Sequence, residues 1–170
     1  MRSLLLFTLA ALALGGCNPT FNWRDVRPDG TRLSLLMPCK PDKAQKTVPL
    51  GGNPTELMML SCDAGGMTFA IGTADIGDAA KVGATLAQWQ AVTLANIKAP
   101  LSSPSTAIKL PGTAPGASLV IAAGQRANGQ AVASQAAYFA QGTRVFQAVV
   151  LASPIAPDAA DTFFSGLKFE

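Results

Sequence analysis

Hydrophobic and polar residues follow three patterns along this chain of 170 residues. A predominantly apolar run without charged residues, LLLFTLAALAL, occupies residues 4–14. Much of the remaining chain alternates apolar and polar residues with a period of two, which is typical of strands with one buried face. Residues 78–97 and a short segment before the C-terminus have the spacing of helices instead. The pattern therefore predicts a leader, followed by a domain of strands with two helices.

Strands joined by tight turns are predicted for the first half of the domain. The runs span residues 21–26, 32–37, 45–50, 55–62 and 67–76. The first two flank a Pro-Asp-Gly turn signal and predict a hairpin, in which Leu33, Leu35 and Met37 share one face and turn inward. The other three runs are bounded by Gly, Pro, Asn or Asp, and we expect them to form an antiparallel meander.

A long helix is predicted for residues 78–97. Val82, Leu86 and Trp89 fall near helical spacing, and Asp78 is placed to cap the N-terminus of the helix. We interpret Trp89 as a core residue, and a ligand-stacking surface is the rival interpretation.

The segment that follows, residues 99–116, is rich in Pro, Gly and Ser. It predicts a long connection that contains one edge strand around residues 107–110. Long connections in compact domains often carry function, so this segment is a candidate recognition loop.

The second half predicts more strands and a short helix. The strands span residues 117–126, 130–140 and 143–153. Asn128-Gly129 between the first two is a strong hairpin signal. Pro157 suits the start of the short helix, Gly166 suits its C-terminal cap, and residues 167–169 add a last strand.

These elements indicate an α+β fold with a mostly antiparallel sheet of about 7–9 strands, one long helix and one short helix. The strand RVFQAVVLAS followed by the helix in PDAADTFFSGLKF resembles the end of PsbP-like domains, and the order of elements over residues 21–170 is similar. That resemblance implies an α/β/α sandwich. It also implies a role as an accessory subunit, a chaperone-like partner or a binder of small ligands, rather than as an enzyme.

The N-terminus has the features of a targeting segment. A short basic segment, MRS, precedes the apolar run, as in signal peptides. That run is shorter than the ~20 apolar residues of a transmembrane helix. It ends in LGGC, which resembles the lipobox of bacterial lipoproteins, in which the cysteine receives a diacylglycerol group and becomes the new N-terminus. The cysteine is Cys17, and a plain secretory signal with an incidental Cys17 is the alternative.

The resemblance to lipoproteins implies a location and a division of the chain. Residues 1–16 are the expected signal peptide, residues 17–20 the lipidated tether, and residues 21–170 a single domain. Acylated Cys17 then holds the protein in the lipid bilayer of the bacterial envelope. Asn18 follows this cysteine, which by analogy with enteric lipoproteins favours the outer membrane, with the domain facing the periplasm.

Cysteine content agrees with lipidation. The chain contains three cysteines, and an exported protein with an odd number leaves one unpaired. If Cys17 carries lipid, Cys39 and Cys62 form a pair in an oxidising compartment. A bridge that closes their loop of roughly two dozen residues stabilises a fold by ~3 kcal/mol. Two buried free thiols are the main alternative, and a metal or redox site is less favoured because the chain lacks a CxxC motif and histidine.

Composition and charge exclude several classes of function. The formal net charge is only +3, and nucleic-acid binding requires a clustered basic stripe, so we expect no nucleic-acid partner. The chain contains no histidine, which removes the usual general base and zinc ligand. No nucleophile elbow or phosphate-binding loop is present. We therefore expect no catalytic residues, metal or cofactor, although a carboxylate pair or a Ser-Lys dyad of Ser34 or Ser61 with Lys40 stays open.

Two classes of function compete at this point. The favoured one is a non-catalytic, membrane-anchored envelope lipoprotein that docks an unknown envelope protein. Trp23, Met58 and Met59 are candidates for its contact surface, since methionine suits an adaptable interface, although alternation favours core packing for Trp23. The alternative is a lipoprotein that binds a small molecule or lipid, in a pocket beside the predicted 78–97 helix or under residues 99–116.

Overall fold

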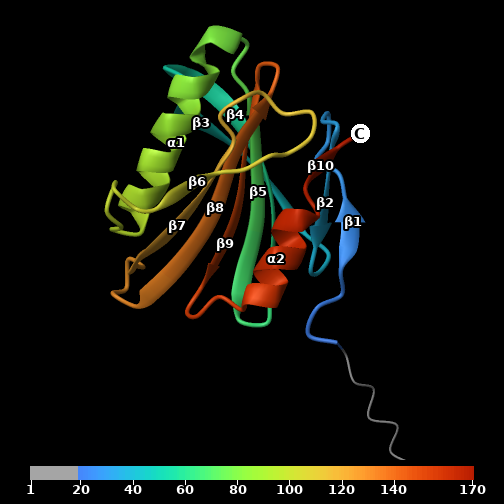
Figure 1. The fold of residues 1–170 in the computed structure, drawn as a ribbon, viewed down its shortest axis with the longest axis vertical. Helices are drawn as coiled ribbons and strands as arrows, with labels where there is room; N and C mark the ends of the chain where they lie inside the picture. The colour runs from blue at the N-terminus through green and yellow to red at the C-terminus, as the bar shows by residue number, and fades with distance from the viewer. Residues whose placement is uncertain (1–18) are drawn as a thin grey trace, which may run out of the picture.

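Residues 19–170 are described by the structure, which is a computed structural model. A seven-stranded sheet with the order β3-β4-β5-β9-β8-β7-β6 forms its centre (Figure 1). Its strands are β3 (Asp42–Leu50), β4 (Asn53–Ala64), β5 (Met67–Asp75), β6 (Ser105–Ala107), β7 (Ser118–Gln125), β8 (Ala131–Gln141) and β9 (Arg144–Ala152). All neighbouring strands are antiparallel, and the two halves of the chain join where β5 pairs with β9.

A second, three-stranded sheet has the order β1-β2-β10. It consists of β1 (Arg24–Val26), β2 (Leu33–Met37) and β10 (Lys168–Phe169). The two ends of the domain meet in this sheet, because Phe169 of β10 lies opposite Leu33 of β2.

Two helices cover opposite faces of the large sheet (Figure 1). The longer helix, α1 (Val82–Asn96), follows a short 3₁₀ turn at Ala79–Lys81. The carboxylate of Asp78 accepts a hydrogen bond of 2.9 Å from the backbone N–H of Ala80, as expected of a cap. The shorter helix, α2 (Pro157–Ser165), shares the other face with the small sheet.

Each face of the large sheet carries its own hydrophobic core, because successive residues of a strand point to opposite sides. On β5, Phe69 and Ile71 enter the core beneath α2 and the small sheet, whereas Ala70 enters the core beneath α1. Trp89 of α1 lies over Gly72, where a Cβ atom would come within 3.0 Å of the indole ring. A glycine at this position lets the helix approach the sheet closely.

A disulfide joins Cys39 to Cys62, with the two Cα atoms 6.1 Å apart. Cys39 lies just after β2 of the small sheet, and Cys62 is buried in β4 of the large sheet. The bridge therefore links the two sheets, and the predicted pairing of these cysteines is confirmed.

The predicted α+β class, with an antiparallel sheet and two helices between and after strands, is confirmed. The predicted inward face of the first hairpin is also confirmed, since Leu33, Leu35 and Met37 are fully buried. The hairpin does not extend the main sheet, however, because β2 pairs with β10 and stacks over that sheet instead. The predicted edge strand around residues 107–110 lies slightly earlier, at Ser105–Ala107.

Cys17 and the leader lie outside the described residues. Within residues 19–170, no helix combines the length and apolar character needed to cross a membrane.

Candidate functional site

The connection between α1 and β7 forms one wall of a groove on the α2 side of the large sheet. After β6, the chain leaves the sheet edge and crosses in front of the large sheet, above α2 in the view of Figure 1. The backbone N–H of Ile108 still bonds to the carbonyl of Ala117 at 3.0 Å, and then the Thr113 N–H bonds to the Leu110 carbonyl at 3.2 Å in a turn. These bonds hold an extended segment above α2.

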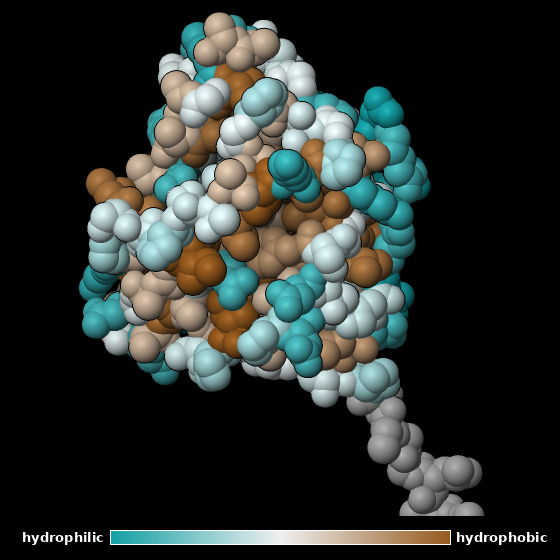
Figure 2. Space-filling model, in the orientation of Figure 1, coloured by the Kyte–Doolittle hydropathy of each residue, from teal (hydrophilic) through white to brown (hydrophobic). Residues whose placement is uncertain are grey.

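The groove has a volume of about 420 Å³. Figure 2 shows it as a hollow with apolar residues at its floor, near the centre of the visible face. We call it the α2 groove, and it is lined by Ile108, Lys109, Leu110, Pro111, Leu119, Phe164, Ser165 and Leu167. Its volume falls within the range of about 300–1,000 Å³ that is typical of ligand pockets.

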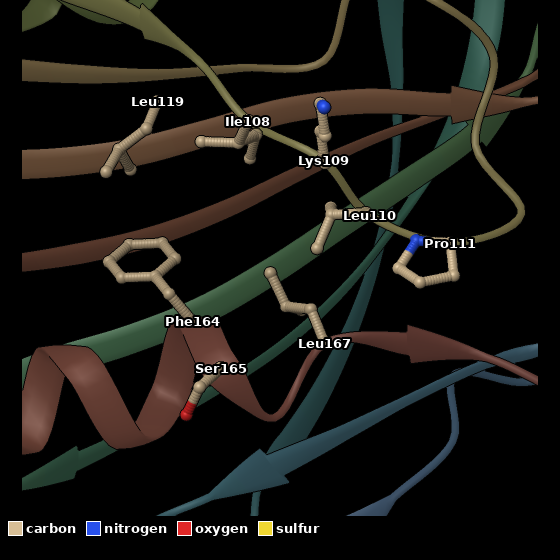
Figure 3. A pocket seen from close by; sticks show the side chains of 8 residues that line it. All are labelled: Ile108, Lys109, Leu110, Pro111, Leu119, Phe164, Ser165 and Leu167. Carbon is tan, nitrogen blue, oxygen red and sulfur yellow. The ribbon is translucent and has the colours of Figure 1, made fainter.

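The side chains inside the α2 groove are apolar. In Figure 3, Leu110 and Leu167 point toward one another from opposite walls, and Phe164 faces Leu119. The two polar lining residues point elsewhere: the Lys109 side chain extends away from α2, and the Ser165 hydroxyl is directed away from the cavity. The polar side chains of the lining therefore do not converge on the interior to orient a polar ligand.

The alternation of side chains along residues 106–110 explains why the apolar ones face the α2 groove and Lys109 does not. Thr106 lies directly opposite Leu119 in the ladder, so its side chain shares the face on which Leu119 contacts the α2-side core. Ile108 and Leu110 follow at intervals of two and pack against the same core. Lys109 lies between them and points to the other face.

Charge is sparse around the α2 groove. Lys109 is exposed and has no carboxylate within ion-pair distance among residues 19–170. Asp158 and Asp161 are both exposed on α2. The groove is thus an apolar surface with one unpaired cation on its wall.

A second hollow of about 310 Å³ lies where the β3–β4 hairpin approaches α1. It is lined by Thr47, Val48, Pro49, Gly52, Asn53, Pro54 and Gln88. Polar side chains on its walls come from Thr47, Asn53 and Gln88, and the Gln88 side chain accepts a hydrogen bond of 3.3 Å from the N–H of Gly51. This hollow lies beside the predicted 78–97 helix, whereas the larger α2 groove lies under the predicted recognition loop.

The three predicted contact residues do not form one surface. The Trp23 ring packs on Phe69 at a centroid distance of 6.1 Å and is half-buried against the α2-side core. Met58 is half-buried and Met59 is 36% exposed. As neighbours in β4, these methionines point to opposite faces of the sheet.

The residues of the α2 groove were missed by sequence reasoning, apart from the general choice of residues 99–116. A usable signal was present in STAIKLPG, where Ile108 and Leu110 flank Lys109 at strand spacing. The other wall, Phe164 and Leu167, comes from the far end of the chain, and its approach depends on tertiary packing.

A partly buried chain of hydrogen-bonded polar side chains lies on the α1 side of the sheet. The Gln147 amide nitrogen donates to the Tyr138 hydroxyl at 3.0 Å and to the Thr93 hydroxyl at 2.7 Å. Thr93 in turn donates to the Trp89 carbonyl at 2.9 Å. Burial raises the pKa of Tyr138 above its usual value, against a smaller opposing effect of hydrogen bonding of its hydroxyl with Thr93 and Gln147. The chain fastens α1 to the sheet.

Comparisons with known proteins assign no family to this chain. Neither a scan against protein-family models nor a search of curated proteins finds a significant match. Within residues 19–170, no three Cys, Asp or Glu side chains gather into a potential metal site.

Proposed function

We propose that this protein is a non-catalytic lipoprotein of the bacterial envelope whose domain docks an apolar segment of a partner protein in the α2 groove. The observation that carries the proposal is the groove itself: about 420 Å³ lined by apolar side chains, with its polar lining residues directed elsewhere. An exposed apolar surface of this kind on a folded domain is typical of an interaction site.

The proposal of an envelope location rests on the N-terminal sequence. LGGC after a short apolar leader resembles a lipobox, and the disulfide between Cys39 and Cys62 suits an oxidising compartment. Acyl chains contribute ~0.8 kcal/mol per buried methylene, so two or more of them anchor a protein stably in a bilayer. The same order of elements that resembles PsbP-like domains supports an accessory role for the domain.

Photo-crosslinking in intact cells tests the docking role. A photoreactive phenylalanine analogue replaces Pro111 on the groove wall, and in a separate strain it replaces Gln130, which is exposed at the β7–β8 turn. We expect one discrete protein adduct from position 111 and none from position 130.

A second substitution makes this test specific for the groove. Leu110→Gln puts a polar group in the groove, and we expect it to lower the adduct yield from position 111 at least about tenfold, because burial of a leucine contributes roughly 1.5–3 kcal/mol. Val92→Gln on α1 is the matched control, because Val92 is 50% exposed on the other side of the sheet. Equal yields from the two variants contradict docking in the groove.

Binding of a small apolar molecule or lipid is the second candidate, and the groove volume supports it. Organic extraction of the purified protein, followed by mass spectrometry, distinguishes the two. A stoichiometric lipid that is lost in Leu110→Gln but retained in Val92→Gln supports ligand binding over protein docking.

The lipid anchor is tested by replacing Cys17. We expect Cys17→Ser to move the protein from the membrane fraction to the soluble fraction, or to leave the leader uncleaved. The intact mass of the wild-type protein should show loss of residues 1–16 and addition of acyl groups. A mature wild-type chain without added mass contradicts lipidation.

A further inference from the structure

Among residues 19–170, the edge strand β6 has one unpaired side. It is the last strand of the large sheet as described, and its pairing partner there is β7 alone. The Pro104 carbonyl accepts from Ile121 at 2.9 Å, and the Ile108 N–H donates to Ala117 at 3.0 Å. The even-numbered residues of this segment therefore direct their backbone groups toward β7, and Ser105 and Ala107 direct theirs outward.

The outward edge is accessible. All three residues of β6 are exposed, and β6 itself contains neither proline nor a charged residue. The opposite edge of the sheet, β3, instead carries Lys43, Lys46 and Pro49, which are residue types that discourage pairing with another strand.

From this edge beside the α2 groove, we infer that the partner binds by strand addition: an extended segment pairs with Ser105 and Ala107 and places alternate apolar side chains over the groove. This inference rests on the proposed docking function and states its mode. Side chains of an added strand alternate between the two faces, and those on the α2 side lie next to Ile108 at the mouth of the groove. The apolar surface continues beyond the groove along the same face of β7 to Ile121, which is 50% exposed.

The charge of Lys109 favours an acidic residue on the face of the added strand that points away from the groove. Lys109 points to the opposite side from Ile108 and Leu110 and has no carboxylate within ion-pair distance among residues 19–170. A carboxylate at the position opposite Lys109 complements it across the new pair. The partner segment therefore alternates apolar residues with polar residues, at least one of them acidic.

Peptides selected from a random decapeptide display library are the probe. The target is the full chain held in lipid nanodiscs, and selected peptides are counter-screened against Leu110→Gln. Ala107→Pro removes an outward N–H without affecting the bonds to β7, a position at which edge strands accept proline. Ala107→Thr is the matched control, because it keeps the N–H and favours a strand.

We expect groove-dependent peptides to bind Ala107→Pro at least about tenfold more weakly than the wild type. A decrease of this size is expected when one or two backbone hydrogen bonds are lost and the proline ring keeps the peptide strand from approaching β6 closely. Binding to Ala107→Thr should change less than about twofold, and hydrogen exchange at the amides of Ser105 and Ala107 should slow on binding. The selected sequences should alternate apolar and polar residues, and Lys109→Glu should abolish a preference for acidic ones.

Two other outcomes overturn the inference in different ways. If peptides lose binding to Leu110→Gln but bind Ala107→Pro like the wild type, strand addition is wrong and docking in the groove stands. If no selected peptide depends on Leu110, both the docking function and strand addition fail.

Discussion

At the scale of single residues, the interior contains polar groups where α1 meets the sheet. Tyr138 is 2% exposed, and its hydroxyl lies 3.0 Å from the Gln147 amide nitrogen. Buried polar groups of this kind are costly unless they are paired. The apolar run around Tyr138 suits a buried strand, but it does not indicate that Gln147 lies within hydrogen-bond distance of the hydroxyl.

The pKa of Tyr138 gives the first prediction. Desolvation favours the neutral phenol, so the folded protein should ionise Tyr138 at a pH above the usual value of 10.0. The contribution of Tyr138 to stability is fully present below the pKa of the unfolded chain, and it is lost as pH rises through the higher folded pKa.

Tyrosinate absorbance measures this directly, because Tyr138 is the only tyrosine of the chain. The native protein should titrate at higher pH than the protein in denaturant, and Tyr138→Phe should remove the signal. Identical titration of the native and denatured protein contradicts burial of this hydroxyl.

Asp75 gives a prediction in the acid range. Its carboxylate accepts hydrogen bonds from the Thr143 hydroxyl at 2.7 Å and the Gly77 N–H at 3.0 Å, and Arg144 is 3.5 Å away. These partners, the Thr143 bond above all, lower the pKa of Asp75. The contribution of Asp75 to stability is present above the pKa that its carboxyl has in the unfolded chain, and it is lost as pH falls through the lower pKa of the folded protein.

Urea unfolding at several pH values tests this. Asp75→Asn should be less stable than the wild type at pH 7, and the difference should shrink as the pH is lowered below 4. Asp161→Asn is the control, because Asp161 is exposed on α2 and accepts no side-chain hydrogen bond in the described structure. A difference that does not depend on pH contradicts the assignment.

At the scale of elements, the sequence indicates most strands because turns and periodicity are local signals. Asp78 caps the 3₁₀ turn before α1 as predicted, and Pro157 begins α2. Pairing between strands that are far apart in the sequence is not a local signal, and so the sequence does not indicate that β2 pairs with β10 rather than with the main sheet. The α2 groove was unpredictable for the same reason, since Leu110 and Leu167 approach each other only in the folded molecule.

Contact between α1 and β7 provides a prediction at this scale. A Cβ atom at Gly124 would overlap the carbonyl oxygen of Ile97, just after α1. That same carbonyl accepts a hydrogen bond of 2.6 Å from Gln125. Gly124→Ala must displace the backbone, and we expect it to lower the free energy of unfolding by about 1–3 kcal/mol.

The matched control is Gly83→Ala on α1. No atom lies within 4 Å of a Cβ atom built at Gly83, and alanine is favoured over glycine within helices by about 0.5–1 kcal/mol. Denaturant unfolding should therefore shift in opposite directions for the two variants. A neutral Gly124→Ala contradicts close approach of the two backbones.

At the scale of the whole molecule, the small sheet and α2 form a layer that packs on one face of the large sheet. The small sheet and α2 share a core with β4, β5, β8 and β9. Aromatic rings pack together in this core. The ring centroids of Phe69 and Phe163 are 5.4 Å apart, and those of Phe163 and Phe164 are 5.2 Å apart. This packing continues to the wall of the α2 groove, so the shape of the groove depends on how the layers fit together.

The disulfide is the covalent link between these layers, and its removal is the last prediction. Cys39 and Cys62 are 23 residues apart in sequence, and the bridge closes a loop that contains β3 and most of β4. The double variant Cys39→Ser, Cys62→Ala should lose about 3 kcal/mol of stability, because the unfolded chain gains the freedom of that loop. Urea unfolding followed by tryptophan fluorescence measures the loss. The wild type with reductant should unfold like the double variant, and reductant should not change the variant. Membrane attachment should stay the same, since the proposed anchor at Cys17 is separate from this pair.

Equal unfolding midpoints for the oxidised wild type and the double variant contradict a stabilising bridge.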